Sequence, residues 1–226
     1  MPTTKDSTTP AVSKQTLQRL PIYLNFLRVH LQEGNSNISA PIVAKALSLN
    51  EVQVRKDLAA ISRNPGRPKT GYDVDILIDD IEEFLGYKNV NDALLVGVGH
   101  LGRALLSYRG FEQYGLNIIT GFDLDSEITG TEICGKPIFP ISRLNDLPAR
   151  LQVQIGIIAV PEDQAQTVCD KMIAAGIRAI WNFAPVHLHV PPGIMVQNEN
   201  MAVSLAVLSQ HLSTVISQST DEDNTI

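Results

Sequence analysis

LLVGVGHLGRALL, residues 94–106, is the stretch that decides the fold of this chain. An apolar run meets three glycines at G-x-G-x-x-G spacing, and a helical apolar pattern follows. Between a strand and a helix, this spacing predicts a loop that binds the pyrophosphate of a dinucleotide. Its first glycine allows a tight turn, its second lets the backbone approach the phosphates, and its third allows close helix–strand packing. The expected contacts are Gly97, Val98, Gly99, His100, Leu101 and Gly102.

An acidic residue follows at the distance that such a loop requires. Asp123 ends the next predicted strand and lies 21 residues after Gly102. A carboxylate there accepts hydrogen bonds from the adenosine ribose hydroxyls and repels a 2′-phosphate, so NAD(H) is favoured over NADP(H). Asp125 is the alternative if the strand ends later.

The chain after residue 93 alternates short apolar segments with helical patterns. We expect strands at 94–98, 117–123, 155–161, 179–183 and 194–197, and helices near 100–109, 162–175 and 201–217. This alternation is typical of a parallel sheet with helices on its faces. Ligands bind outside the carboxyl ends of such strands, where the sequence places Ala159, Val160, Pro161, Phe183, Ala184 and Pro185. These six residues form either an apolar nicotinamide wall or ordinary loop starts, and spacing does not separate the two.

A helical apolar stripe opens the first third of the chain. Leucines three and four residues apart run from 17 to 31. Pro21 interrupts the stripe, so we expect a short turn followed by a main helix that begins at Pro21 and ends at Gly34.

Two shorter helices are predicted next. Ser39 is expected to cap a helix at 40–47, and Asn50 with Gln53 resembles a capping box that opens a helix at 51–62. Helix, tight turn, helix is the arrangement whose second helix fits a DNA major groove.

Charge also favours a nucleic-acid partner for the first third of the chain. Residues 1–72 hold ten Lys/Arg and four Asp/Glu, whereas residues 73–226 hold eight and twenty. The segment SRNPGRPKTGYDV, residues 62–74, predicts a hairpin wing with a basic tip. A solvated charged face is the alternative. The predicted contacts with double-stranded DNA are Ser39, Gln53, Arg55, Lys56, Arg63, Arg67 and Lys69.

Several other functions find little support. There is no apolar run of about 18 residues for a membrane span, and the polar N-terminus lacks a secretion signal. Cys134 and Cys169 form no disulfide framework and fit a reducing cytoplasm. No metal site is expected. After the last predicted strand only about thirty residues remain, too few for a typical substrate domain. We therefore predict no enzyme; a small NAD-dependent oxidoreductase and a CoA- or nucleotide-binding module are the alternatives.

The last predicted helix needs an apolar partner. Its apolar side would be formed by Leu205, Leu208, Leu212, Val215 and Ile216. We expect this helix to pair with a second copy in a homodimer; packing on its own domain is the alternative. A two-fold dimer would present two recognition helices to a pseudo-palindromic site.

Together these patterns predict an α/β protein with two domains. A disordered leader at 1–12 precedes a winged helix-turn-helix domain at 13–88. A Rossmann-type parallel-sheet domain follows at 89–200, and a dimerising helix with a tail occupies 201–226.

From about residue 13 to residue 212 the sequence resembles the Rex redox-sensing transcriptional repressors. The motifs VQVRKDL, GRPKTGYDV, VGVGHLGRALLSY, IAVP, AGIRAIWNFAP and VPPGIMVQNENMAVSL occur in that family's order and spacing. The resemblance implies a cytoplasmic bacterial homodimer with a swapped last helix, in which NADH releases DNA and NAD+ competes with NADH. Matching positions assign the glycines and Asp123 to the NAD site, Arg55 and Lys56 to the recognition helix, and Arg67 and Lys69 to the wing.

The resemblance also implies a switch between the domains, and here the sequence departs from some members. Tyr108 matches a tyrosine of that switch. Asn25 stands where those members carry an arginine, and Asn200 where they carry an aspartate. Two neutral amides interact more weakly than a charge-assisted pair, so we expect the switch to be altered. His100 stands where asparagine is common.

Overall fold

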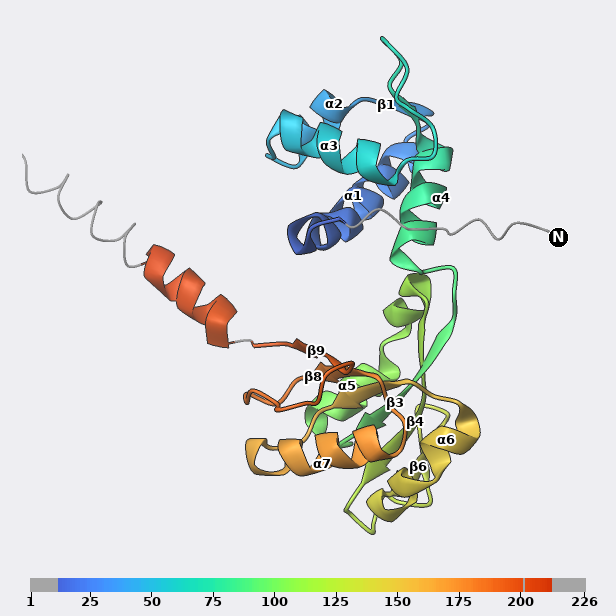
Figure 1. Ribbon diagram of the computed structural model, residues 1–226, viewed down its shortest axis with the longest axis vertical. Helices are drawn as coiled ribbons and strands as arrows, with labels where there is room; N and C mark the ends of the chain where they lie inside the picture. Colours follow the sequence, from blue (N-terminus) through green and yellow to red (C-terminus); the bar gives the residue numbers. More distant parts are fainter. Residues whose placement is uncertain (1–11, 201, 213–226) are drawn as a thin grey trace, which may run out of the picture. The chain divides into compact units, whose positions relative to one another are not determined.

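The protein folds as two compact units, which meet in the sequence between Asn89 and Val90. Figure 1 shows the computed structural model, which describes residues 12–200 and 202–212. The predicted leader, apart from Val12, lies outside the described residues.

The first unit is a winged helix-turn-helix, as predicted. Its elements are α1 (Lys14–Gln32), β1 (Asn37–Ile38), α2 (Ala40–Ala46), α3 (Glu51–Ile61), β2 (Tyr72–Asp73) and α4 (Val74–Leu85). The strands β1 and β2 pair antiparallel at the base of the wing. The helices share one apolar core, which includes Leu20, Leu24, Leu27, Val43, Val54, Leu58, Leu77 and Ile81.

The expected helix start at Pro21 is wrong. Helix α1 runs unbroken from Lys14 to Gln32, with Pro21 inside it and Ser13 as its N-cap. An internal proline costs a helix about 3 kcal/mol. The buried stripe of Leu20, Tyr23, Leu24 and Leu27 continues past Pro21, and each such side chain contributes roughly 1.5–3 kcal/mol. Packing therefore outweighs the proline.

Helix α3 begins where the capping pattern placed it, but the pattern is only half right. Asn50 Oδ1 accepts from the backbone N–H groups of Val52 and Gln53, at 3.0 and 3.2 Å. The Gln53 side chain does not reach back toward Asn50; its Nε2 donates to Asp57 Oδ1 at 2.9 Å. Ser39 precedes α2 without a side-chain cap bond.

A buried carboxylate fixes α3 against α1. Asp57 is only 2% exposed. It accepts hydrogen bonds from Arg19 Nε at 2.7 Å, Tyr23 Oη at 2.9 Å and Thr16 Oγ1 at 3.1 Å, besides the Gln53 bond. Burial alone would raise the pKa of Asp57, but the bonds from Arg19, Gln53, Tyr23 and Thr16 outweigh it and hold this pKa below its usual value.

The second unit contains a Rossmann-type sheet. Its strand order is β5-β6-β4-β3-β7-β8-β9, and all neighbours run parallel except β5 and β6. The strands are β3 (Asn91–Val96), β4 (Leu116–Asp123), β5 (Glu132–Ile133), β6 (Lys136–Pro140), β7 (Ile155–Ile158), β8 (Ala179–Asn182) and β9 (Met195–Asn198). The connecting helices are α5 (His100–Ser107), η1 (Arg109–Tyr114), η2 (Ile141–Asn145), α6 (Leu147–Leu151) and α7 (Glu162–Ala174).

Helices cover both faces of this sheet. In β3, Leu94 and Val96 belong to the core that includes α7, whereas Ala93 and Leu95 belong to the core that includes Leu106 of α5. This alternation explains why the whole strand is apolar. The five predicted strands are all present with small shifts of their ends.

The sequence did not predict β5 and β6. Residues 136–140 read KPIFP, and two prolines so close together argue against a strand. The strand forms because β6 lies near the edge of the sheet, where its ladder needs few N–H donors. It pairs with the last three residues of β4.

Residues 202–212 form a helix that residues 12–200 leave exposed. Leu205, Leu208 and Leu212 are 63, 67 and 59% exposed. Val215 and Ile216 of the predicted apolar side lie outside the described residues. Within residues 12–200 and 202–212, no helix is both long and apolar enough to cross a membrane.

We predict that Asp57→Ala lowers the stability of the first unit by about 3–5 kcal/mol, because it leaves Arg19 and Tyr23 without their buried acceptor. Since the pKa of Asp57 is lowered in the folded chain, its contribution is complete above the unfolded pKa and is lost as pH falls through the folded one. The gap from wild type should therefore be constant above about pH 5 and narrow below about pH 4.

Hydrogen exchange measures the stability of each unit, through the amides of residues 51–61 in the first and of residues 162–174 in the second. The matched control is Asp170→Ala, because Asp170 also accepts from a glutamine one helical turn earlier, Gln166 Nε2 at 2.8 Å, but on an exposed face. We expect the control to change stability by less than about 0.5 kcal/mol. Equal effects of the two variants would contradict the structural role given to Asp57.

Candidate functional site

The glycine loop lies where the strand order of the sheet reverses. From β3 the chain passes through α5 to β4 on one side, while β7 pairs with the other side of β3. In open parallel sheets such a switch point leaves a crevice at the carboxyl ends of the strands, and ligands bind there. The loop of residues 97–99 follows β3 directly into this crevice.

Two of the three glycines are required by the protein's own packing. Gly97 has φ +96°, and a Cβ there would lie 2.4 Å from the carbonyl oxygen of Ala159. At Gly102, in the first turn of α5, a Cβ would lie 1.9 Å from the carbonyl oxygen of Gly97. Both positions therefore accept only glycine, and together they bring the N-terminus of α5 close to the end of β3.

Gly99 differs from the other two, because no steric contact within the described part of the chain requires a glycine there. It is the N-cap of α5, with φ −72° and ψ −160°, a backbone that any residue adopts. Apart from its two chain neighbours, no described residue has an atom within 4 Å of a Cβ built there. The space beside Gly99 opens toward the crevice, at the positive end of α5. The absence of a side chain there fits a pyrophosphate that approaches the backbone closely.

Two adjoining cavities extend from this loop. One, of about 470 Å³, is lined by Gly97, Gly99, Ala159, Val160, Pro161, Ile141 and Gln164 among others. The second, of about 450 Å³, is lined by Val98, His100, Arg103 and Ile128 among others. The linings of both cavities include Gly99, Asp123 and Asp125. An elongated ligand could therefore run past Gly99 from one cavity into the other.

Asp123 lies at the mouth of the loop in a fixed orientation. Its Oδ2 accepts from the backbone N–H of Val98 at 2.6 Å, and its Oδ1 accepts from the N–H groups of Leu124 and Asp125 at 2.7 and 3.0 Å. A carboxylate has about four acceptor sites, two on each oxygen, so Oδ1 is fully used and Oδ2 keeps one site for a ribose hydroxyl. Asp125 is held by one backbone bond, which its Oδ1 accepts from the N–H of Glu127 at 2.8 Å. The arrangement favours Asp123 over Asp125 as the ribose ligand.

The structure does not bring every predicted residue to these cavities. Phe183, Ala184 and Pro185 are absent from both linings, because β8 is separated from β3 by β7. Ala184 is buried in the core, and the Phe183 ring packs 4.9 Å from that of Trp181. Leu101, partly exposed on α5, lines neither cavity. Arg103, Ile141 and Gln164 do line them, and no motif marked these three residues.

Tyr108 lies at one end of a row of aromatic side chains. Its ring meets Phe111 edge-on at 4.8 Å, and Phe111 meets Trp181 at 5.4 Å. Trp181 Nε1 donates to Glu199 Oε1 at 2.9 Å, and the next residue, Asn200, accepts from the N–H of Ala202 at 3.0 Å. The row thus leads from Tyr108 to the start of the last helix. Asn25 lies exposed on α1, in the other unit, and its relation to Asn200 stays a prediction.

The recognition helix presents a polar face of the predicted composition. Val54, Leu58 and Ile61 of α3 are buried, while Gln53, Arg55 and Lys56 are exposed. Arg55 pairs with Glu51 one turn earlier, with 62% of its side chain still exposed. Asp57 falls on the buried stripe at the spacing 54, 57, 58, 61. A carboxylate in that register was a signal, missed by the sequence reasoning, that a buried partner had to exist.

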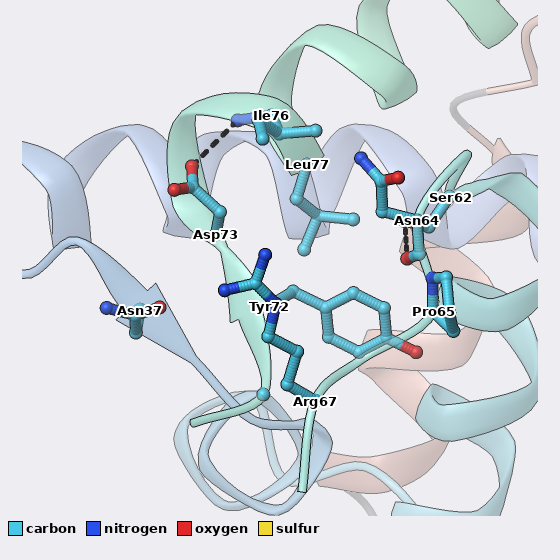
Figure 2. A pocket seen from close by; sticks show the side chains of 10 residues that line it. Asn37, Ser62, Asn64, Pro65, Arg67, Tyr72, Asp73, Ile76 and Leu77 are labelled. Atoms are coloured by element: carbon cyan, nitrogen blue, oxygen red, sulfur yellow. Dashed lines mark hydrogen bonds between the residues drawn. The ribbon is translucent and has the colours of Figure 1, made fainter. Parts of the chain in front are cut away.

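The wing is a hairpin with a basic tip. The N–H groups of Arg67 and Gly71 each donate to the other residue's carbonyl, at 2.7 and 2.8 Å. Lys69 lies between them, exposed and with φ +72°. Figure 2 shows the Arg67 side chain beside Tyr72 in a pocket of about 360 Å³ between the wing and α4. Of the two predicted tip residues, only Lys69 lies at the turn.

Arg63, a predicted DNA contact, forms ion pairs with acids of its own unit. Its Nε pairs with Asp80 Oδ1, its NH2 nitrogen lies 2.8 Å from Asp79 Oδ2, and its NH1 nitrogen lies 3.2 Å from Glu83 Oε2. All three acids belong to α4, which the charge pattern of the first third did not include. Its side chain is still 56% exposed, and its contact with DNA stays a prediction.

Comparisons with known proteins agree with this two-part site. A family model described as "CoA binding domain" matches residues 88–186, and one described as "Putative DNA-binding protein N-terminus" matches residues 11–59. The redox-sensing transcriptional repressor Rex of Porphyromonas gingivalis is 41% identical over 204 residues, which cover 90% of this chain and 93% of the relative. Rex of Bacteroides fragilis is 39% identical over 209 residues, which cover 92% of this chain and 94% of the relative.

Solved structures give the same result. The crystal structure of RSP in complex with β-NAD+ and operator DNA matches with a TM-score of 0.86 at 30% identity, over 96% of this chain and 99% of RSP. RSP in complex with β-NADH matches with a TM-score of 0.82 at 30% identity, over 92% of this chain and 98% of RSP. RSP is described as a Rex-family repressor. The chain therefore belongs to the Rex family of redox-sensing transcriptional repressors.

Proposed function

We propose that this protein represses transcription in response to the NADH/NAD+ ratio. It binds operator DNA through α3 and the wing, and NADH bound at the glycine loop releases it. The observation that carries the proposal is the presence in one chain of an unexplained glycine, Gly99, at a cavity with a fixed carboxylate, and of an exposed basic recognition helix. RSP, at 30% identity, has been crystallised with β-NADH and with β-NAD+ and operator DNA.

The residues at the loop suit each part of NAD(H). The amides at the start of α5 and the bare backbone at Gly99 would hold the pyrophosphate. Asp123 would hold the adenosine ribose, and Ala159, Val160 and Pro161 would line the space for the nicotinamide end. When bound, the cofactor carries the redox signal, because NADH and NAD+ differ in the charge and shape of the nicotinamide ring. The chain's own part is to hold one form more tightly in one arrangement of its two units.

The proposal includes a homodimer. The uncovered helix of residues 202–212 exposes Leu205, Leu208 and Leu212, and a second copy would bury them. Two recognition helices would then meet two half-sites, and NADH would act by changing their spacing. A DNA-bound repressor of bacterial genes works in the cytoplasm, which we infer for this chain.

We also propose that the cofactor is sensed and not consumed. The relatives are repressors. In the linings of the two cavities the one histidine is His100, which belongs to the phosphate loop and has no substrate pocket beside it in the described part of the chain. A gel shift on promoter DNA with NADH and with NAD+ tests the proposal. DNA binding that is unchanged by saturating NADH would defeat it, and steady loss of NADH absorbance with a carbonyl substrate would favour an oxidoreductase.

Gly99→Ala should abolish the NADH response and leave DNA binding and folding intact. The new methyl group meets no protein atom within 4 Å, but it would occupy the space for the pyrophosphate. We expect at least about a tenfold loss of NADH affinity, measured by cofactor fluorescence. Gly97→Ala is the control for the fold, because its Cβ would meet the Ala159 carbonyl at 2.4 Å; it should destabilise the domain. Full NADH affinity in Gly99→Ala would refute the assigned loop.

Asp123→Ala should weaken NADH binding about tenfold or more, because a ribose ligand that makes charge-assisted bonds is lost. The same variant separates NADH from CoA, the ligand class in the description of one matching family model. If CoA were the ligand, the loss of Asp123 should matter little. Calorimetric titration of both ligands into wild type and variant decides between them.

Arg55→Ala should weaken DNA binding and flatten its salt dependence by about one unit of slope, as expected when one phosphate contact is lost. Arg150→Ala is the matched control. Arg150, like Arg55, is an exposed arginine that pairs with an acid one turn earlier, Asp146, but it lies in the other unit. Fluorescence anisotropy at several salt concentrations measures both. Similar effects of the two variants would contradict a specific role for Arg55.

A further inference from the structure

The side chain of Gln53 is exposed but not free. Gln53 is the third residue of α3, in the first turn of the recognition helix. Its Nε2 donates to Asp57 Oδ1 at 2.9 Å, one turn further along. Residues in the first turns of such helices are the ones that contact base edges. The question is what a glutamine held in this way presents to DNA.

The partner of Gln53 determines which way its amide points. An ionised carboxylate accepts hydrogen bonds and donates none, so only the NH2 end of Gln53 can face Asp57. Asp57 itself is held by Arg19, Tyr23 and Thr16 of α1. The amide of Gln53 is therefore oriented by a fixed, buried group, and its Oε1 together with its second N–H is left for solvent or a ligand.

The other side chains near the start of α3 offer a chemistry that differs from that of Gln53. Asn50 Oδ1 accepts two backbone N–H groups as the helix cap. Arg55 pairs with Glu51. Val52, which is 58% exposed, offers only apolar atoms. Among residues 50–55, Gln53 alone presents a neutral acceptor and a donor from one oriented group.

Resting on the proposed function, we infer that Gln53 reads an adenine in the major groove of each operator half-site, with Asp57 as the residue that positions its amide. Adenine presents an N6–H donor beside the N7 acceptor, which is complementary to an amide oxygen beside an N–H. Guanine presents two acceptors at the same edge, O6 and N7, and would leave Oε1 facing an oxygen. Asp57 would secure this choice by keeping the amide from rotating.

The experiment selects DNA from a pool of randomised duplexes with the full-length chain and sequences the bound fraction. Wild type should enrich one adenine per half-site that Gln53→Ala no longer enriches, with about a tenfold loss of discrimination at that position. Other positions of the site should keep their preferences. Gln53→Glu, which can only accept, should shift the same position toward cytosine, whose edge offers an N4–H donor.

Gln166→Ala is the matched control, because Gln166 pairs with Asp170 in the same way on α7 of the other unit. It should leave every preference unchanged. Asp57→Asn tests the positioning role: it should relax the adenine preference more than the preferences at the other positions of the same selected sites, which serve as the internal reference. If Asp57→Asn fails to fold, the Gln53 variants still decide, since Gln53 is exposed and hydrogen exchange of α3 verifies their folding.

The outcomes distinguish a failure of the Gln53 inference from a failure of the proposed function. Selected sites whose adenine preferences all survive in Gln53→Ala would overturn this inference alone. A wild-type chain that enriches no sequence would overturn the proposed function as well. A preference lost equally in Gln53→Ala and Gln166→Ala would also overturn the inference, because it would then reflect a general loss of binding.

Discussion

The close approach of α5 to the end of β3 is the constraint on which the cofactor site depends. With no Cβ at Gly102, the helix comes down onto the Gly97 carbonyl, where a methyl group would lie 1.9 Å away. Gly97 in turn fits against the Ala159 carbonyl at the end of β7. These contacts fix where the amides of the α5 N-terminus point, and they leave Gly99 as the one loop glycine whose reason lies outside the chain.

Each unit also contains a carboxylate that is held in place by donors before any ligand arrives. Asp57 is held by side chains from two helices, and Asp123 by three backbone N–H groups. Such prior ordering reduces the entropy that binding must overcome. In unit one the ordered acid orients a neighbouring amide; in unit two the ordered acid lines both cavities at the glycine loop. The two sites thus use the same device for different purposes.

The sequence predicts what depends on local pattern and leaves open what depends on distant partners. The glycine spacing, Asp123, the capped start of α3 and the basic wing follow from neighbouring residues. The unbroken α1 does not, because the packing that overrides Pro21 comes from other helices. The ion pairs of Arg63 do not follow from local pattern either, because its acidic partners lie some sixteen to twenty residues away on α4. Phe183 lies outside the two cavity linings because β7 separates β8 from β3, and strand order cannot be read from strand ends.

The row of rings from Tyr108 to Phe183 contains the only tryptophan of the chain. Trp181 lies on β8, which β7 separates from β3, the strand that leads into the glycine loop, and its indole N–H donates to Glu199. The emission of an indole overlaps the absorption band of a reduced nicotinamide and not that of an oxidised one. The fluorescence of this single tryptophan would therefore report the redox form of the bound cofactor, because NADH would quench its emission by energy transfer and NAD+ would not.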